Sequence, residues 1–232
     1  MTLPAPARIV VNGGMQSSWG VLFDWDGVVI DSSSQHERAW ELIAAERGLP
    51  LPADHFLKGF GKKNEVIIPD LGWASDPTEV AALSFRKEEL YRELVAREGV
   101  TVLPGARELL DALRREGVPR ALGSSTPREN LAALFAATGL GSLFDAVVCG
   151  SDVRHGKPDP EVFLAAAERI SLTPERCVVL EDAFAGIEAA RRAGMRVVGV
   201  ATTNPLESLA GCDLAVASLA GLTPRDLAAL IP

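Results

Sequence analysis

Short runs of β-branched and other apolar residues alternate in this chain with longer segments that have helical periodicity. Several of the helical segments carry boundary signals, with Pro shortly before the start and Gly after the end. The predicted strands are residues 21–25, 119–123, 146–149, 177–180 and 196–200. This β-α-β order is typical of a parallel sheet that is covered by helices on both faces. The sequence therefore predicts an α/β fold with a three-layer, doubly wound parallel sheet, whose ligands bind beyond the carboxyl ends of the strands.

One long segment interrupts this alternation. Residues 33–102 contain no run that favours a strand, but they include three stretches with helical periodicity, at 34–47, 62–71 and 77–98. We interpret the segment as a helical cap domain inserted after the first strand, and residues 19–32 and 103–232 as the core domain. Residues 1–18 show no periodicity and are predicted to form an N-terminal tail.

The charge balance disfavours two classes of partner. The chain has 23 Lys and Arg against 31 Asp and Glu, a net charge of −8, so no global basic field attracts nucleic acid or an anionic membrane. No apolar run approaches the roughly 20 residues that span a bilayer, and the apolar stretch at residues 9–11 is too short for a secretory signal. We therefore expect a cytoplasmic protein in which Cys149, Cys177 and Cys212 are reduced thiols.

Two carboxylates follow the first predicted strand. In the segment VLFDWDGV, Asp24 and Asp26 stand two residues apart, so their side chains share one face of an extended backbone. Two acids this close require a cation or a proton on one of them. The pair suits a Mg2+ site with a nucleophile and a general acid/base, and Gly27 allows a sharp turn beneath a ligand. The alternative is an exposed Asp-Gly turn at the end of a strand.

Polar residues also follow three later strands. Ser124 and Ser125 precede a predicted helix N-terminus, where hydroxyl and N–H groups can hold phosphate oxygens. Lys157 offers a cation within the rigid segment HGKPDP. Glu181 and Asp182 repeat the pattern of a strand followed by acids and can complete an oxygen shell for Mg2+. Because the carboxyl ends of parallel strands meet at one edge, these side chains are expected to converge there.

Taken in order, the segments DWDGV, a strand-end Ser, GKPDP and ED resemble the motifs of the haloacid dehalogenase-like (HAD) superfamily over about residues 19–220. The helical insert after the first motif resembles the subgroup that contains β-phosphoglucomutases and small-molecule phosphatases. The resemblance implies a Rossmann-like core and a Mg2+-dependent hydrolase that forms an aspartyl-phosphate intermediate. Dehalogenases of the superfamily do not carry the second Asp, so Asp26 argues against that branch.

The resemblance also implies a role for each motif residue. Asp24 would be the nucleophile and Asp26 the general acid/base, while Ser124 and Lys157 would hold phosphoryl oxygens. Such a site is chemically consistent, because cations and hydrogen-bond donors stabilise the charge of a transferred phosphoryl group. The implied Mg2+ ligands are the Asp24 carboxylate, the Asp26 backbone carbonyl and Asp182, with Glu181 beside them.

Residues of the cap are expected to select the substrate. The segments HERAW and LKGFGKKN resemble the β-phosphoglucomutase-like subgroup, which implies substrate contacts from His36, Lys58 and Lys62, with Ser125 contributing from the core. Lys62 stands where the mutases carry an Arg, and Lys binds phosphate as a point charge without a bidentate fork. The alternatives are solvated lysines and a core or helix-capping histidine. Ala183, where many relatives have Ser or Thr, removes a possible hydrogen bond beside the metal site.

These features predict a Mg2+-dependent phosphatase of a small phosphorylated metabolite such as a sugar phosphate. One alternative is a phosphotransferase of the β-phosphoglucomutase type, which differs only in the group that accepts the phosphoryl. Another is a non-enzymatic, phosphate-responsive regulator, although receiver-type regulators are shorter and have no cap insert. Because a single-chain cap can close over its own site, a monomer is expected.

Overall fold

The computed structural model describes residues 17–59 and 63–232. The chain divides into two compact units, one made of the chain up to Asp31 together with Thr101–Pro232, the other made of Ser32–Val100. The short antiparallel pair of β2 (Ile30–Asp31) and β3 (Thr101–Val102) belongs to the larger unit. The helical pattern predicts the insert at residues 33–102, so the two divisions differ by at most two residues at either joint.

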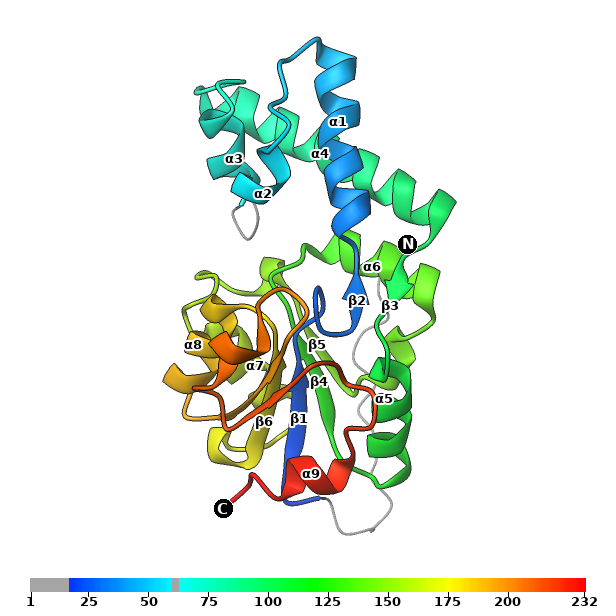
Figure 1. The fold of residues 1–232 in the computed structure, drawn as a ribbon, viewed down its shortest axis with the longest axis vertical. Coiled ribbons are helices and arrows are strands. Elements are labelled where there is room, and N and C mark those ends of the chain that lie inside the picture. Colours follow the sequence, from blue (N-terminus) through cyan, green and yellow to red (C-terminus); the bar gives the residue numbers. More distant parts are fainter. Residues whose placement is uncertain (1–16, 60–62) are drawn as a thin grey trace. The chain divides into compact units, whose positions relative to one another are not determined.

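A six-stranded parallel sheet forms the centre of the larger unit, in the order β5-β4-β1-β6-β7-β8 (Figure 1). The strands are β1 (Gly20–Phe23), β4 (Arg120–Gly123), β5 (Ala146–Val148), β6 (Cys177–Glu181), β7 (Arg196–Val200) and β8 (Leu214–Val216). The chain proceeds from β1 to β5 in one direction and continues with β6 on the other side of β1. This reversal beside β1 is the topological switch point at which doubly wound sheets bind ligands.

Helices cover both faces of this sheet. They are α5 (Ala106–Arg115), α6 (Arg128–Thr138), α7 (Glu161–Arg169), α8 (Phe184–Arg192) and α9 (Pro224–Ala228). Leu22 and Val179 share a buried cluster with Phe163 of α7 and Ile187 of α8, two helices that lie side by side. Successive strand residues point to opposite faces, and α5 contacts β4 outside that cluster through its own leucine-rich face. The predicted three-layer α/β architecture is confirmed.

The strand register brings the ends of β1, β4 and β6 together. Phe23 pairs with Leu122 on one side and with Leu180 on the other. The Asp24 backbone N–H then donates to the Leu180 carbonyl (3.0 Å), so Asp24 is the first residue beyond this common edge. All four residues of β1 and all five of β6 are buried, as expected for central strands of a covered parallel sheet.

The structure corrects the prediction at several short elements. The first strand ends at Phe23 rather than at residue 25, because the backbone turns back and the Trp25 carbonyl accepts from Val29 N (2.9 Å) and Ile30 N (3.1 Å). Trp25 is fully buried and packs edge-on against Phe135, with ring centroids 5.2 Å apart. The sequence pattern also did not predict β2, β3 and β8, which have two or three residues each and are too short to show an alternation.

The smaller unit is helical. Its helices are α1 (Ser33–Arg47), α2 (His55–Gly59), α3 (Asn64–Asp70) and α4 (Pro77–Glu98). Asp76 caps α4 by accepting from Thr78 N (2.9 Å) and Glu79 N (3.2 Å), which explains why this helix begins where the sequence changes from loop to helical periodicity. Trp40 packs against Trp73 in the core of the unit, with centroids 5.6 Å apart. The five-residue α2 was not predicted.

The cysteines and the composition of the helices also bear on the expectations from the sequence. Cys149, Cys177 and Cys212 are free thiols, as predicted. Among the described helices, none combines the length and the apolar composition needed to cross a membrane.

Candidate active site

A buried lysine links two of the motif carboxylates at the carboxyl edge of the sheet. The Lys157 Nζ donates to Asp24 Oδ1 (2.7 Å) and to Glu181 Oε1 (2.7 Å). Only 9% of the Lys157 side chain is exposed, and its Nζ also lies 4.7 Å from the centre of the Phe163 ring. The structure therefore brings together residues from the first, third and fourth motifs, which are far apart in the sequence.

The electrostatics of this trio follow from two acids sharing one cation in a buried place. Burial, with added repulsion from Glu181 and Asp182, raises the pKa of Asp24 well above its ordinary value even though Lys157 opposes the shift. For Lys157, burial disfavours the charge, but attraction from Asp24 and Glu181 outweighs it and raises the pKa of the amine. Lys157 is therefore a permanent cation, and the carboxyl cluster remains short of positive charge.

Asp182 completes a group of acids that could hold a metal ion. Asp24, Glu181 and Asp182 each offer a carboxylate oxygen, and these oxygens lie within 4.8 Å of one another. Burial, with repulsion from Glu181 as the next cause, raises the pKa of Asp182 to about 7. Hard oxygen ligands with unmet negative charge are what Mg2+ requires. The residues present therefore fit the predicted magnesium site.

Within this group, Glu181 differs from the other two acids in its hydrogen bonds. Its Oε1 accepts from Lys157, and its Oε2 accepts from the Ala183 backbone N–H (2.7 Å). The space beside it is closed by Gly186, where a Cβ would lie 1.6 Å from Glu181 Oε1. Both Glu181 oxygens are therefore engaged in holding Lys157 and the start of α8, which favours Asp24 and Asp182 as the carboxylates that face an ion.

Asp26 is oriented by a hydroxyl that the sequence pattern did not single out. Thr126 Oγ1 donates to Asp26 Oδ2 (2.6 Å), across a separation of 100 residues. Thr126 lies in the same loop as Ser124, whose Oγ in turn accepts from the Thr126 N–H (3.0 Å). Ser124 is buried and Ser125 is exposed. The only sequence signal for Thr126 was its place in a loop of hydroxyl residues.

Two more residues missed by the sequence pattern hold Asp182. Thr203 Oγ1 donates to Asp182 Oδ2, and Asn204 Nδ2 donates to the Asp182 backbone carbonyl (2.8 Å). Both follow β7, the strand next to β6. Thr203 thus supplies a hydroxyl to the acid pair from the neighbouring loop, which offsets the hydrogen bond that Ala183 cannot make. Gly27 closes the other side, with φ of +80° and no room for a Cβ, which would lie 2.0 Å from Asp182 Oδ2.

His36 and Lys58, two of the cap residues predicted to contact the substrate, lie in the smaller unit and have different neighbours. His36 stacks on Tyr91, with centroids 4.0 Å apart, and its Nδ1 lies 2.7 Å from Lys87 Nζ. Burial, followed by the charge of Lys87, lowers the pKa of His36 to about 3, so the imidazole is neutral. Lys58 is exposed and pairs with Asp54 (2.7 Å). Lys62 lies outside the described residues.

Known proteins are similar to this chain in sequence and in fold. A family model described as haloacid dehalogenase-like hydrolase matches residues 20–194. The chloroplastic 5-amino-6-(5-phospho-D-ribitylamino)uracil phosphatase of Arabidopsis thaliana is 37% identical, covering 92% of this chain, which spans 58% of that protein's length. The β-phosphoglucomutase of Bacillus subtilis is 34% identical, covering 88% of this chain and 91% of its own.

A solved structure extends the similarity to three dimensions. The family IA HAD hydrolase of Entamoeba histolytica superposes with a TM-score of 0.83 at 28% identity, covering 92% of this chain and 99% of that one. The family match includes the strands and loops that carry Asp24, Lys157 and Glu181. The chain therefore belongs to the haloacid dehalogenase-like hydrolases, in the subfamily that includes β-phosphoglucomutase and sugar phosphate phosphatases.

Proposed function

We propose that this protein is a Mg2+-dependent phosphatase that removes phosphate from a small sugar or polyol phosphate through an aspartyl-phosphate at Asp24. The observation that carries the proposal is the Asp24 carboxylate held by Lys157 (2.7 Å) beside an Asp26 that is oriented by Thr126 (2.6 Å). This arrangement places a nucleophile, a cation and a candidate acid/base at one sheet edge. One of the relatives is named as a phosphatase of 5-amino-6-(5-phospho-D-ribitylamino)uracil, a small phosphorylated metabolite.

Each residue has a role in the proposed reaction. An Asp24 oxygen attacks phosphorus, and the bond to the substrate oxygen breaks while Asp26 donates a proton to that oxygen. In the second step Asp26 takes a proton from water, which attacks phosphorus and releases Asp24 and phosphate. Lys157 and the loop containing Ser124 neutralise the oxygens of the transferred group throughout. Asp24, Asp182 and the Asp26 backbone carbonyl would hold Mg2+, which supplies positive charge for the phosphoryl oxygens when bound.

Metal removal gives one test. We expect EDTA to stop phosphate release and Mg2+ to restore it better than Ca2+, because Ca2+ gathers 6–8 oxygens at longer distances. The raised pKa of Asp24 and of Asp182 (about 7) adds a pH dependence, since protons compete with the cation for the same oxygens. Mg2+ should therefore raise the melting temperature of the metal-free protein more at pH 8 than at pH 6. Equal activity in Ca2+, or a larger stabilisation at pH 6, would contradict the proposed ligand set.

The specific rival is a mutase, which the similarity to β-phosphoglucomutase favours. A mutase must protect its phosphoenzyme from water while a bisphosphate turns round, which requires a second, firm phosphate site. In this chain that site would depend on Lys62, helped by Lys58 or Lys63, instead of an Arg fork. We therefore expect water to discharge the phosphoenzyme, with free phosphate released from several sugar and polyol phosphates.

The deciding assay supplies β-glucose 1-phosphate with a trace of the 1,6-bisphosphate and follows glucose 6-phosphate and free phosphate together. Phosphate release from a panel of sugar phosphates, without faster isomerisation, supports the phosphatase. Isomerisation that outruns phosphate release many-fold identifies a mutase. Failure of every phosphorylated metabolite in the panel to react would leave the phosphate-responsive regulator as the better description.

A further inference from the structure

We propose that Asp152 is a positioning residue that clasps together two loops of the site: the serine loop (residues 124–127) and the lysine loop (residues 149–157). The inference rests on the proposed function, because it concerns the groups assigned to the phosphoryl oxygens. Asp152 does not touch the candidate catalytic carboxylates. It lies within the lysine loop but outside the motif HGKPDP.

The two loops start from neighbouring strands and are in close contact. Gly123 of β4 pairs with Val148 of β5, and the Ser124 N–H donates to the Val148 carbonyl (3.0 Å). One step further, the Gly150 N–H donates to the Thr126 carbonyl (3.0 Å). A Cβ on Gly150 would lie 2.2 Å from the Ser125 carbonyl oxygen. Any shift of one loop must therefore move the other or break these bonds.

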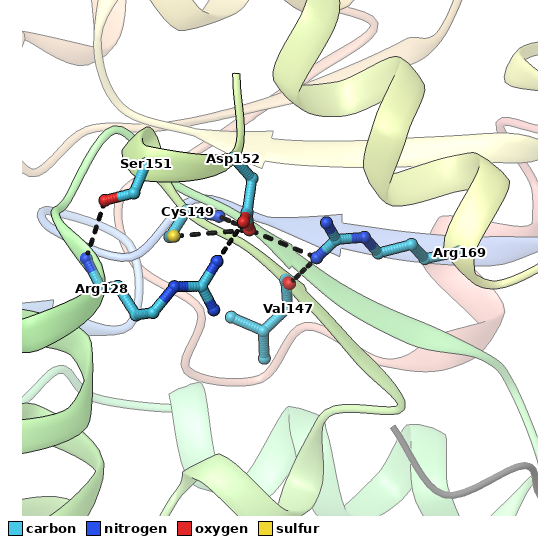
Figure 2. A network of polar contacts seen from close by, with 6 residues as sticks. All are labelled: Arg128, Val147, Cys149, Ser151, Asp152 and Arg169. Carbon is cyan, nitrogen blue, oxygen red and sulfur yellow. Dashed lines mark hydrogen bonds and ion pairs between the residues drawn. The ribbon is translucent and has the colours of Figure 1, made fainter. Parts of the chain in front are cut away.

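Asp152 gathers donors from the start of the lysine loop and from the helices α6 and α7 onto one carboxylate (Figure 2). Its Oδ2 accepts from the Cys149 N–H (3.1 Å), from the Cys149 thiol (3.4 Å) and from Arg169 Nη1 (3.3 Å). Its Oδ1 accepts from Arg128 Nη2. Only 11% of the Asp152 side chain is exposed, whereas the two arginine side chains are about half exposed. The carboxylate is thus the buried centre of the cluster.

The two arginine partners of Asp152 lie at the ends of the helices α6 and α7. Arg128 is the first residue of α6 and follows directly on the serine loop, and its backbone N–H donates to Ser151 Oγ (3.4 Å). Arg169 is the last residue of α7, the helix that follows the lysine loop, and it also donates to the Val147 carbonyl. The clasp therefore ties the start of α6 and the end of α7 to the short turn, Gly150–Asp152, that follows β5.

The charge of Asp152 is secured by these contacts. Burial alone disfavours the carboxylate, but hydrogen bonds from Cys149 and attraction from Arg169 and Arg128 keep the pKa of Asp152 below its ordinary value. Charge-assisted hydrogen bonds are the stronger kind. Thr126, which orients Asp26, is separated from Arg128 by a single residue, so loosening the clasp should be felt at Asp26 as well as at Lys157.

Asp152→Ala tests the proposal, with Asp145→Ala as a matched control. Asp145 makes comparable bonds to Arg120 N (2.8 Å) and Arg120 Nη2 (2.8 Å), but at the amino ends of the same two strands, away from the site. Misplacing catalytic groups by about 1 Å can cost on the order of a hundredfold. We expect Asp152→Ala to lower kcat at least tenfold with little change in KM, and Asp145→Ala to lower the melting temperature by as much or more while kcat is retained.

Amide hydrogen exchange gives a readout that does not need activity. Peptides containing Gly150 and Arg128 should exchange faster in Asp152→Ala than in the unchanged protein or in Asp145→Ala. Asp152→Asn, which keeps an oxygen for the Cys149 N–H but loses the charge, covers the case in which the Ala variant does not fold, and it should show the same pattern.

The outcomes separate this inference from the proposed function. If the unchanged protein hydrolyses no phosphate ester, the proposed function fails, and unchanged exchange in the Asp152 variants would overturn the clasp independently. If Asp145→Ala loses as much kcat as Asp152→Ala, Asp152 serves stability alone and the positioning role is wrong. A kcat loss and faster loop exchange confined to the Asp152 variants support it.

Discussion

Asp24→Asn is expected to abolish phosphate release while the protein stays folded. The amide is nearly isosteric, so it leaves no cavity, but it cannot attack phosphorus or bring a charge to the metal. Because burial and neighbouring acids already disfavour the charged form of Asp24, the neutral amide relieves that cost. The melting temperature of the metal-free variant should therefore equal or exceed that of the unchanged protein. Steady-state phosphate release and thermal unfolding measure the two effects.

Asp213→Asn is a suitable control for this experiment. Like Asp24, Asp213 pairs with a cationic side chain, since Arg196 Nη1 donates to its Oδ1 (2.9 Å), and it also accepts from the Val197 N–H (2.8 Å). It precedes β8 at the amino edge of the sheet, so its loss should leave turnover unchanged. Substantial activity in Asp24→Asn that survives re-purification would show that another group is the nucleophile.

Lys157→Ala is expected to lower kcat by about a hundredfold or more, the usual loss for a preorganised group that stabilises charge in a transition state. The structure adds a stability effect, because this substitution leaves Asp24 and Glu181 buried without their shared cation. In the unchanged protein Lys157 lowers the pKa of Asp24, so the substitution Lys157→Ala raises the pKa of Asp24 further.

The sign of the pH dependence follows from this shift. A carboxyl whose pKa is higher in the folded than in the unfolded state binds an extra proton on folding, so stability falls as the pH rises from the unfolded to the folded pKa. The metal-free Lys157→Ala protein should therefore lose more stability relative to the unchanged protein at pH 8 than at pH 5, as measured by urea unfolding. Arg196→Ala is the control, because Arg196 is a half-exposed arginine at the amino edge of the sheet. Activity of Lys157→Ala within about threefold of the unchanged protein would contradict its charge-stabilising role.

The fold could be predicted because its signals are local. Buried parallel strands must be apolar on both faces, so the runs that became β1, β4, β5, β6 and β7 were visible without any partner. The helical insert could be predicted because its helical periodicity continues over more residues than a random sequence would give, as in the 22 residues of α4. Strands of two or three residues, such as β3 and β8, carry no such period and form only because a neighbouring strand offers hydrogen-bond partners.

The candidate site divides in the same way. The sequence by itself determined which side chains stand at or beyond the strand ends, namely Asp24, Lys157 and the Glu181-Asp182 pair, because parallel strands deliver successive loops to one edge. Only the tertiary structure decided how those groups interact: that one lysine serves two acids, and that Thr126 and Thr203 orient Asp26 and Asp182. The physical reason is that a hydrogen bond from a threonine hydroxyl to a residue far away in the chain produces no periodic pattern in the sequence. The strand register and burial decide which acceptor the hydroxyl meets, and both exist only once the sheet has formed.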